Sequence, residues 1–393
     1  MEKHLYYAFT NTQIINMINV KNSFFPNILA DLYVIDHGRI SENLIQNIVD
    51  EKIFDCVYYI IHHPHSKLRK SVFRLPGILR KPILSVFIGF NYLQYQRFFH
   101  KQNEVMYSVL FMPGFWTDAG YFANHYYRYN PKLSIYFVEE GTVNYTAGIY
   151  NLCYILNSFH PVVRLLWKFT NGGNKISDFK KLISHVNGMY LYVPENHQQH
   201  NDMEKLLLLP SISKDSSTHR LLTKSTSEMV LARYNSCNVI YFMQNQNQDI
   251  IQYTIFGEYM QEITSLSSVR LLIKQHPDYS VSCSCFNDLN NYLHDNAVID
   301  CDDYLLEGIY AKIDLDSKIL ITRDSSSVMY PKYMFSKEPI VIFTYKLYSD
   351  YYSENSKKLD GLMHDLSRTY ADKSKIYAPQ SIDDLVYLIS KLV

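Results

Sequence analysis

Hydrophobic and polar positions alternate in blocks through the first half of the chain. Apolar runs such as HLYYAF (4–9) and CVYYIIHH (56–63) predict strands, and the amphipathic stretch SENLIQNIVDE (41–51) predicts a helix between strands. Apolar runs that are separated by helices are typical of parallel strands buried on both faces of a sheet. We expect the remaining elements of this half, one helix and three strands, at residues 10–20, 30–37, 107–115 and 133–141.

The same alternation returns in the second half of the chain after a polar and broken stretch. Residues 196–235 show no sustained apolar pattern, and we predict that they form an interdomain connection with some helix. Residues 381–393 predict an amphipathic closing helix, for which a return to the first domain is left open. The pattern therefore predicts an α/β protein with two domains, 1–195 and 236–393. We expect the strands of the second domain at 237–245, 269–277, 317–327 and 338–345.

Composition and charge narrow the class of protein. Hydrophobic residues make up 47% of the 393 residues, too many for a disordered chain, and the net charge of zero gives no overall field that attracts nucleic acid. None of the six cysteines forms a C-x-x-C pair, so we expect free thiols in a reducing compartment. The N-terminus lacks the features of a signal peptide, and no apolar run reaches the length of a membrane span. We therefore expect a cytoplasmic protein.

Two adjacent glutamates and a glycine end the predicted strand at 133–141. The two carboxylates of Glu139 and Glu140 repel each other, which raises the pKa of one of them toward a value useful for a general base. Successive strand residues point to opposite faces, so one carboxylate can contact a ligand while the other supports it. Gly141 allows the turn to approach a ligand closely. The alternative is a solvated turn that carries two charges.

Two further groups of polar residues follow predicted strands in the second half. His276 and Pro277 end the strand in LLIKQHP, and such a histidine can donate a hydrogen bond to a phosphate. Three serines, 325–327, end the predicted strand at 317–327, and hydroxyl and N–H groups at the start of a helix are typical of a phosphate site. An ordinary histidine at the end of a strand and a helix cap without a ligand are the alternatives.

The three motifs together resemble those of bacterial sialyltransferases, namely the lipooligosaccharide type and the capsular polysialyltransferases. These enzymes share a D/E-D/E-G motif, an HP motif and a serine-rich motif in this order, read here as EEG (139–141), HP (276–277) and SSS (325–327). The match is good over EEGTVNY (139–145), and elsewhere it rests on pattern, including a first strand followed by Thr12 and Gln13. The resemblance implies a GT-B fold, with two Rossmann-like domains that face a central cleft.

The resemblance also implies a mechanism. The first domain would bind the acceptor and supply the base, Glu139, with Glu140 orienting or tuning it, although the sequence leaves open which of the two is the base. The reaction would move sialic acid from CMP-sialic acid to a glycan with inversion. The leaving phosphate would be stabilised in the second domain, and neither a metal nor another cofactor is expected. The implied nucleotide and phosphate site consists of His276, Pro277, Ser325, Ser326 and Ser327.

A basic segment, HSKLRKSVFRLPGILRKP (65–82), bears on the acceptor. Its basic residues alternate with apolar ones, a pattern typical of membrane-surface contact or of polyanion binding. A solvated helix face is the alternative. The segment favours a lipid-linked or polyanionic acceptor, such as a capsular chain, and a peripheral contact with the inner face of the cell membrane. The basic residues are Lys67, Arg69, Lys70, Arg74, Arg80 and Lys81.

Other motifs are weaker. Asp314-Leu315-Asp316 has the D-x-D pattern of metal-dependent glycosyltransferases, and HHPH (62–65) has metal-like spacing that Pro64 interrupts; we interpret both as chance. Three alternative functions stay open: a CDP-alcohol-dependent glycerophosphotransferase, a UDP-sugar glycosyltransferase of capsule synthesis, and a non-catalytic glycan-binding protein of capsule assembly. No nucleic acid partner is expected.

Overall fold

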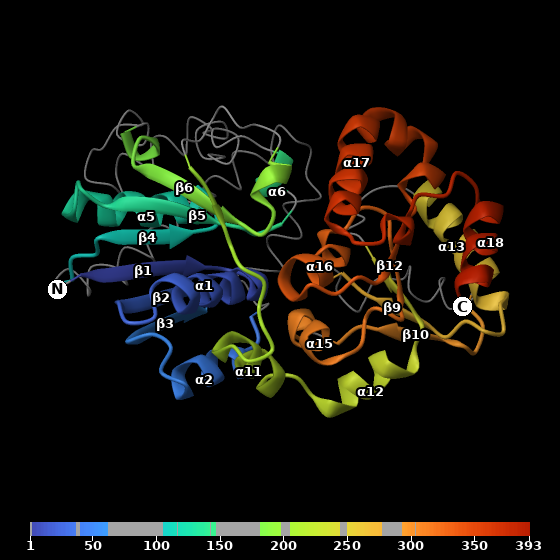
Figure 1. Cartoon of the computed structure of the whole chain (residues 1–393), viewed down its shortest axis with the longest axis horizontal. Helices are drawn as coiled ribbons and strands as arrows, with labels where there is room; N and C mark the ends of the chain where they lie inside the picture. Colours follow the sequence, from blue (N-terminus) through green and yellow to red (C-terminus); the bar gives the residue numbers. More distant parts are fainter. Residues whose placement is uncertain are drawn as a thin grey trace. The chain divides into compact units, whose positions relative to one another are not determined.

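The chain forms two compact α/β units, Met1–Pro210 and Ser211–Val393, each a parallel sheet with helices (Figure 1). The two-domain α/β prediction is therefore confirmed, and the boundary between the units falls inside the stretch predicted as a connection. The computed structural model describes residues 2–36, 40–61, 105–115, 117–141, 143–146, 181–197, 205–243, 250–276, 293–302 and 304–393.

The first unit contains a seven-stranded sheet of order β3-β2-β1-β4-β5-β6-β7, in which every pair is parallel. The strands are β1 (Lys3–Ala8), β2 (Leu29–Asp36), β3 (Cys56–Ile61), β4 (Val109–Met112), β5 (Ser134–Val138), β6 (Val186–Leu191) and β7 (Leu206–Leu208). The described helices are α1 (Asn11–Phe24), α2 (Glu42–Asp50), α5 (Thr117–Tyr129), α6 (Val143–Thr146) and the 3-10 helix η2 (Pro194–Asn196).

Local sequence explains where the first elements begin and end. Residues 5–8 of β1 are fully buried, as expected for a strand covered on both faces. Thr10 then caps α1, because its side chain accepts a hydrogen bond from the backbone N of Gln13 at 3.3 Å. The strand order changes direction at β1, which has β2 on one side and β4 on the other. In open α/β sheets, ligands bind near such a switch point, at the carboxyl ends of the strands.

The second unit contains a six-stranded parallel sheet of order β10-β9-β8-β11-β12-β13. Its strands are β8 (Val239–Phe242), β9 (Leu271–Lys274), β10 (Ala297–Asp300), β11 (Ile319–Thr322), β12 (Ile340–Phe343) and β13 (Ile376–Tyr377). Its described α-helices are α11 (Ser217–Lys224), α12 (Glu228–Ser236), α13 (Ile250–Ser265), α15 (Leu306–Lys312), α16 (Tyr330–Phe335), α17 (Ser349–Thr369) and α18 (Ile382–Leu392). The described part of this unit also contains three 3-10 helices: η5 (Ser326–Val328), η6 (Tyr345–Leu347) and η7 (Lys373–Lys375).

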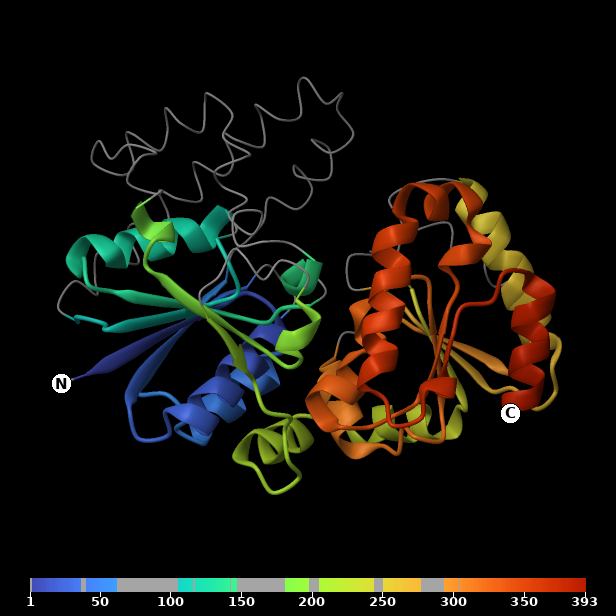
Figure 2. The same ribbon diagram turned by 45° about the horizontal axis from the view of Figure 1, so that its top comes forward.

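The closing helix α18 belongs to the second unit. It packs beside α13 on one face of the second sheet, as both ribbon views show (Figures 1 and 2). Leu385 and Ile389 of α18 join a buried cluster with Tyr259 and Ile263 of α13 and with alternate residues of the strands. A return of the last helix to the first unit, left open by the sequence, is not what the structure shows.

The stretch 196–235 is less a separate connection than the sequence suggests. Residues 206–208 form β7, an edge strand of the first sheet, while α11 and α12 lie in the second unit and contact α15.

None of the helices in the described part of the chain is long and apolar enough to cross a bilayer. Cys56, Cys237 and Cys301 carry free thiols, as expected.

Candidate functional site

The acidic pair lies at the carboxyl end of β5, where Glu139 and Glu140 follow Val138. Glu139 is only 1% exposed. Its Oε2 accepts a hydrogen bond from the backbone N of Tyr192 at 2.9 Å and another from the hydroxyl of Tyr145. Its Oε1 has no hydrogen-bond partner among the described residues. The carboxylate is therefore held through one oxygen only.

Burial makes the carboxyl group of Glu139 a weaker acid than that of an ordinary glutamate. The pKa of its carboxyl is raised from 4.5 to about 7, chiefly by burial, and the hydrogen bonds from Tyr145 and from the backbone N of Tyr192 oppose part of that rise. The sequence led us to expect repulsion from Glu140 as the cause, and the structure replaces that cause with burial. A carboxyl group of this pKa can accept a proton near neutral pH.

Glu140 and Gly141 complete the turn. Glu140 is half-buried, and its Oε2 accepts a hydrogen bond at 2.7 Å from Nε2 of Gln13, whose Oε1 in turn accepts one from the backbone N of Phe9. The two glutamates thus have separate partners, in agreement with their alternation along the chain. Gly141 has a φ of 143°, which other residues rarely adopt. Its carbonyl accepts a hydrogen bond from the backbone N of Asn144.

A stripe of buried amides on α1 supports the acidic pair. Gln13, Asn16 and Asn19 are all less than 5% exposed and recur every three residues, so they share one face of the helix. Asn16 donates from Nδ2 to the backbone O of Glu139 at 2.8 Å and accepts from the hydroxyl of Tyr192 at 2.8 Å. The sequence prediction named Gln13 only. The signal available was three amides at helical spacing in an otherwise apolar helix.

In the second unit, His276 and the serines lie at the same edge of the sheet. Lys274, Phe242 and Thr322 are in register across β9, β8 and β11. His276 follows Lys274 by two residues, and Ser325 follows Thr322 by three. Since neighbouring strands are about 4.8 Å apart, the ends of β9 and β11 are separated by roughly 10 Å. Both groups thus flank the carboxyl end of β8, and each follows the end of a strand, as predicted. Pro277 lies outside the described residues.

The serine turn is held by its own hydrogen bonds. The Oγ of Ser325 accepts from the backbone N of Ser327 at 3.2 Å, and the two hydroxyls lie 2.8 Å apart. The backbone N of Ser325 donates to Oγ1 of Thr322, which donates to the carbonyl of Phe242. The expected helix after the serines exists but is short, namely η5 followed by the six-residue α16. The geometry shows a cap, and phosphate binding by the serines stays a prediction.

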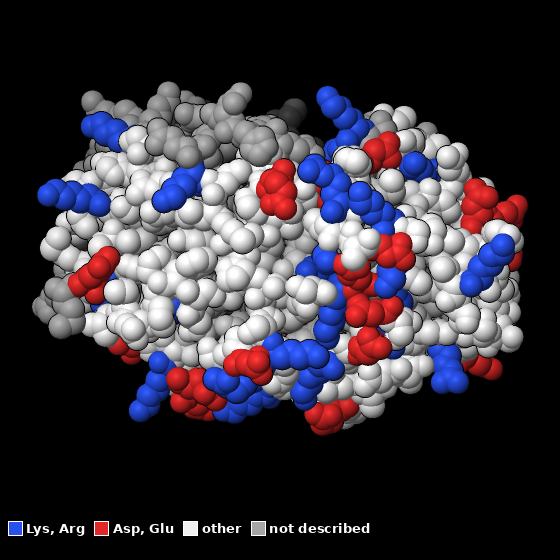
Figure 3. Space-filling view, in the orientation of Figure 1, with Lys and Arg blue, Asp and Glu red and all other residues white. Residues whose placement is uncertain are grey.

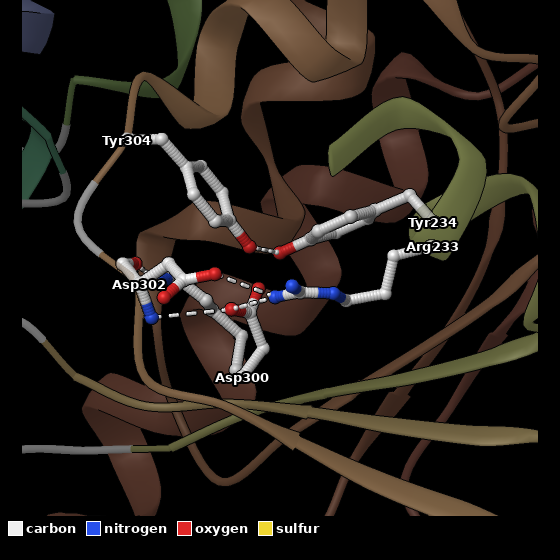
Figure 4. A network of polar contacts seen from close by, with 6 residues as sticks. Arg233, Tyr234, Asp300, Asp302 and Tyr304 are labelled. Atoms are coloured by element: carbon white, nitrogen blue, oxygen red, sulfur yellow. Dashed lines mark hydrogen bonds and ion pairs between the residues drawn. The ribbon is translucent and has the colours of Figure 1, made fainter. Parts of the chain in front are cut away.

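An ion-pair network fixes the loop that follows β10, the neighbour of β9 (Figure 4). Asp300 is completely buried, and its Oδ1 lies 2.7 Å from Nη1 of Arg233 on α12. The same nitrogen lies 2.8 Å from Oδ2 of Asp302. One arginine therefore neutralises a buried and an exposed carboxylate together.

Aromatic residues extend this network toward His276. The hydroxyl of Tyr304 donates to that of Tyr234 at 2.6 Å (Figure 4). The ammonium group of Lys274 lies 4.2 Å from the centroid of the Tyr304 ring and donates to the backbone O of Asp302. The end of β9, two residues before His276, is thereby tied to the loop after β10. Sequence reasoning missed the network.

Other predicted features have different outcomes. Asp314 and Asp316 form a turn before β11, where Asp316 donates from its backbone N to Oδ1 of Asp314 at 3.1 Å. This turn lies before the amino end of β11, whereas Ser325 follows the carboxyl end of the same strand. Within the described ranges, no three His, Cys, Asp or Glu residues are grouped so as to hold a metal ion. HHPH (62–65) lies outside the described residues, as do the basic residues Lys67, Arg69, Lys70, Arg74, Arg80 and Lys81.

The described surface carries mixed charges. On the face shown in Figure 3, basic and acidic side chains are interspersed, and the coloured residues form no extended patch of a single sign. This agrees with the zero net charge.

Comparison with solved structures identifies the architecture. UGT89C1 of Arabidopsis thaliana, solved in complex with UDP-L-rhamnose, matches with a TM-score of 0.54 at 8% identity, over 99% of this chain and 89% of that chain. The chain has the GT-B fold. No protein-family model matches it, and no curated protein matches it in sequence.

Two further GT-B-like similarities are weaker. An alpha/beta-galactoside alpha-2,3-sialyltransferase of Photobacterium phosphoreum matches with a TM-score of 0.49 at 12% identity, over 98% of this chain and 99% of that chain. A UDP-N-acetylglucosamine 2-epimerase matches with a TM-score of 0.49 at 10% identity, over 100% of this chain and 88% of that chain. Both scores lie below one half, so neither distinguishes a transferase from an epimerase.

Proposed function

We propose that the protein is an inverting glycosyltransferase that transfers sialic acid from CMP-sialic acid to a glycan acceptor without a metal ion. The observation that carries the proposal is Glu139, a buried carboxyl at the end of β5 with a pKa of about 7, one oxygen of which has no hydrogen-bond partner among the described residues. Such a group suits general-base catalysis near neutral pH. The resemblance of the EEG, HP and SSS motifs to those of bacterial sialyltransferases supports sialic acid as the transferred sugar.

In the proposed reaction, the acceptor hydroxyl gives its proton to Glu139 as its oxygen attacks the anomeric carbon. The bond from that carbon to the phosphate oxygen breaks, the configuration inverts, and CMP leaves with the electron pair of the broken bond. Glu140 is held by Gln13 and supports the turn. His276, Ser326 and Ser327 stabilise the charge that grows on the departing phosphate.

The acceptor belongs to the proposal as well. The resemblance and the basic segment 65–82 favour a lipooligosaccharide or capsular acceptor, lipid-linked or polyanionic, reached at the inner face of the cell membrane. A lipid-linked acceptor would bring the enzyme to that surface, and a basic amphipathic segment would assist such a contact.

A thermal-shift titration with CMP, CMP-sialic acid, CDP and UDP, with and without EDTA, tests the donor. We expect CMP and CMP-sialic acid to raise the melting temperature whether or not EDTA is present, because a ligand at 100 times its Kd stabilises the native state by about 2.7 kcal/mol. His276→Ala should abolish the shift. Alanine at His364, an exposed histidine of α17, is the matched control and should leave the shift unchanged.

Each other outcome of the titration contradicts the proposal. Stabilisation by UDP alone would favour a UDP-sugar glycosyltransferase, and stabilisation by CDP alone would favour a glycerophosphotransferase. No stabilisation by any nucleotide would favour a non-catalytic glycan-binding protein.

A further inference from the structure

Tyr145, which follows the turn of the acidic pair, contacts the side chain of Glu139. This residue lies in α6, six positions after Glu139, and its side chain is 3% exposed. Its hydroxyl donates to Oε2 of Glu139 and accepts a hydrogen bond from the backbone N of Val193 at 3.3 Å. The phenol therefore joins the carboxylate to the segment that follows β6.

The hydrogen bonds make the two oxygens of Glu139 unequal. Oε2 accepts two hydrogen bonds, from Tyr145 and from the backbone N of Tyr192, whereas Oε1 accepts none from the described residues. We infer that Tyr145 is a positioning residue for the proposed base, which holds the carboxylate in place through Oε2. This inference rests on the proposed function.

Of the two described hydrogen-bond donors to the Glu139 carboxylate, only the Tyr145 hydroxyl belongs to a side chain and can be removed by mutation. Glu139 faces Tyr145 from α6, Tyr192 from the end of β6 and the amide of Asn16 from α1, and Glu140 is its neighbour in the chain. Among the described residues, no cation contributes to the pKa of Glu139. The bond from Tyr192 comes from its backbone and survives any change of its side chain, so the hydroxyl of Tyr145 is the removable donor.

Tyr145→Phe tests the inference, because it removes this donor and keeps the ring. A hydrogen bond to a charged group lowers a carboxyl pKa by about one to two units, so the pKa of Glu139 should rise by that amount in the variant. The acid limb of the pH profile of kcat/KM should move upward equally. At pH 7 the variant should lose roughly 5- to 50-fold in rate, and it should recover most of the loss near pH 9.

A second readout makes the test independent of turnover. The ¹³C chemical shift of the Glu139 carboxyl, assigned by its loss in Glu139→Gln, can be followed against pH in the wild type and in Tyr145→Phe. Tyr107→Phe is the matched control, because the hydroxyl of Tyr107 donates to the buried carboxylate of Asp31 at 2.5 Å in the same unit. It should change neither the Glu139 titration nor the pH profile.

The two readouts separate the possible failures. A Glu139 carboxyl pKa that does not change in Tyr145→Phe would overturn the inference. A pKa that rises while the pH profile stays fixed would overturn the positioning role. If the wild type transfers sugar from no donor, the proposed function fails, and with it the role of Tyr145 in positioning a base. The carboxyl titration would then still show whether the hydroxyl holds the carboxylate.

Discussion

Glu139→Gln should abolish sugar transfer and, at the same time, make the folded protein more stable at pH 8. The loss of a general base should lower the rate by at least about 100-fold. The gain in stability follows because burial raises the pKa of this carboxyl from 4.5 to about 7, so the folded state is penalised for carrying its charge. A shift of this size is equivalent to about 3 kcal/mol once the group is ionised in both states.

The sign of the effect sets its pH window. Below about pH 4.5 the Glu139 carboxyl is protonated in the folded and the unfolded state, and it contributes nothing to the difference. Between pH 4.5 and 7 only the folded state keeps the proton, so the stability of the wild type falls as the pH rises. Above about pH 7 the penalty is complete. Glutamine has no such penalty, although its amide nitrogen then lacks a partner, which offsets part of the gain.

Urea unfolding of both proteins at pH 5 and pH 8 measures this window. The free energy of unfolding of Glu139→Gln, relative to the wild type, should rise by about 2 to 3 kcal/mol between the two pH values. Glu195→Gln is the control, because the side chain of Glu195 is exposed and the change removes no buried charge. The free energy of unfolding of this variant, relative to the wild type, should change little between the two pH values. A Glu139→Gln variant that gains nothing at pH 8, or that transfers sugar at the wild-type rate, would contradict the assignment.

The central strands of both sheets could be predicted from the sequence because they are buried on both faces. All four residues of β8 and all four of β11 are buried. The four residues of β8 and the first three of β11 appear in the chain as uninterrupted apolar runs. The positions of Glu139, His276 and Ser325 followed from the same runs, since each residue lies within three positions of the end of a strand. In a parallel sheet, the carboxyl ends lie at one edge.

Two of the edge strands, β10 and β13, escaped prediction for the opposite reason, whereas the edge strand β3 was predicted at 56–63. The strand β10 is only four residues long and has one exposed valine, Val298, and β13 has two residues, both half-buried. Such short, partly exposed segments carry no apolar run that distinguishes a strand from a loop. The strand β6 was missed as well, because it begins with the half-buried Val186, the exposed Asn187 and a glycine before its buried apolar residues.

Two of the hydrogen-bond partners of Glu139 could not be predicted because they are distant in sequence. Tyr192 is 53 residues from Glu139, and Asn16 is 123 residues from it. A periodic pattern specifies which residues are buried but not which of them meet across a sheet. The raised pKa of Glu139 shows the consequence, because its cause is tertiary burial rather than the neighbouring charge visible in the sequence.

Arg233→Met should destabilise the second unit by about 3 kcal/mol. The carboxylate of Asp300 is completely buried, and Arg233 is its partner at 2.7 Å. Removing one member of a buried ion pair leaves an uncompensated charge in the interior, which typically costs about 3 to 5 kcal/mol. The backbone N of Asp302, 3.2 Å from the same carboxylate, remains as a donor and keeps the expected cost at the lower end.

Two further variants determine whether the buried charge is the cause. Lys312→Met breaks the exposed pair of Lys312 with Glu228, which has the same 2.7 Å separation, and should cost less than about 1 kcal/mol. Asp300→Asn combined with Arg233→Met should recover part of the loss, because the double variant no longer buries an unpaired charge. Urea unfolding of the wild type, Arg233→Met, Asp300→Asn and the double variant gives the four free energies of the cycle. If the two changes were simply additive, the arginine would stabilise the unit through its packing, and the charge of Asp300 would have no part in holding the loop that leads from β10 back toward β9 and His276.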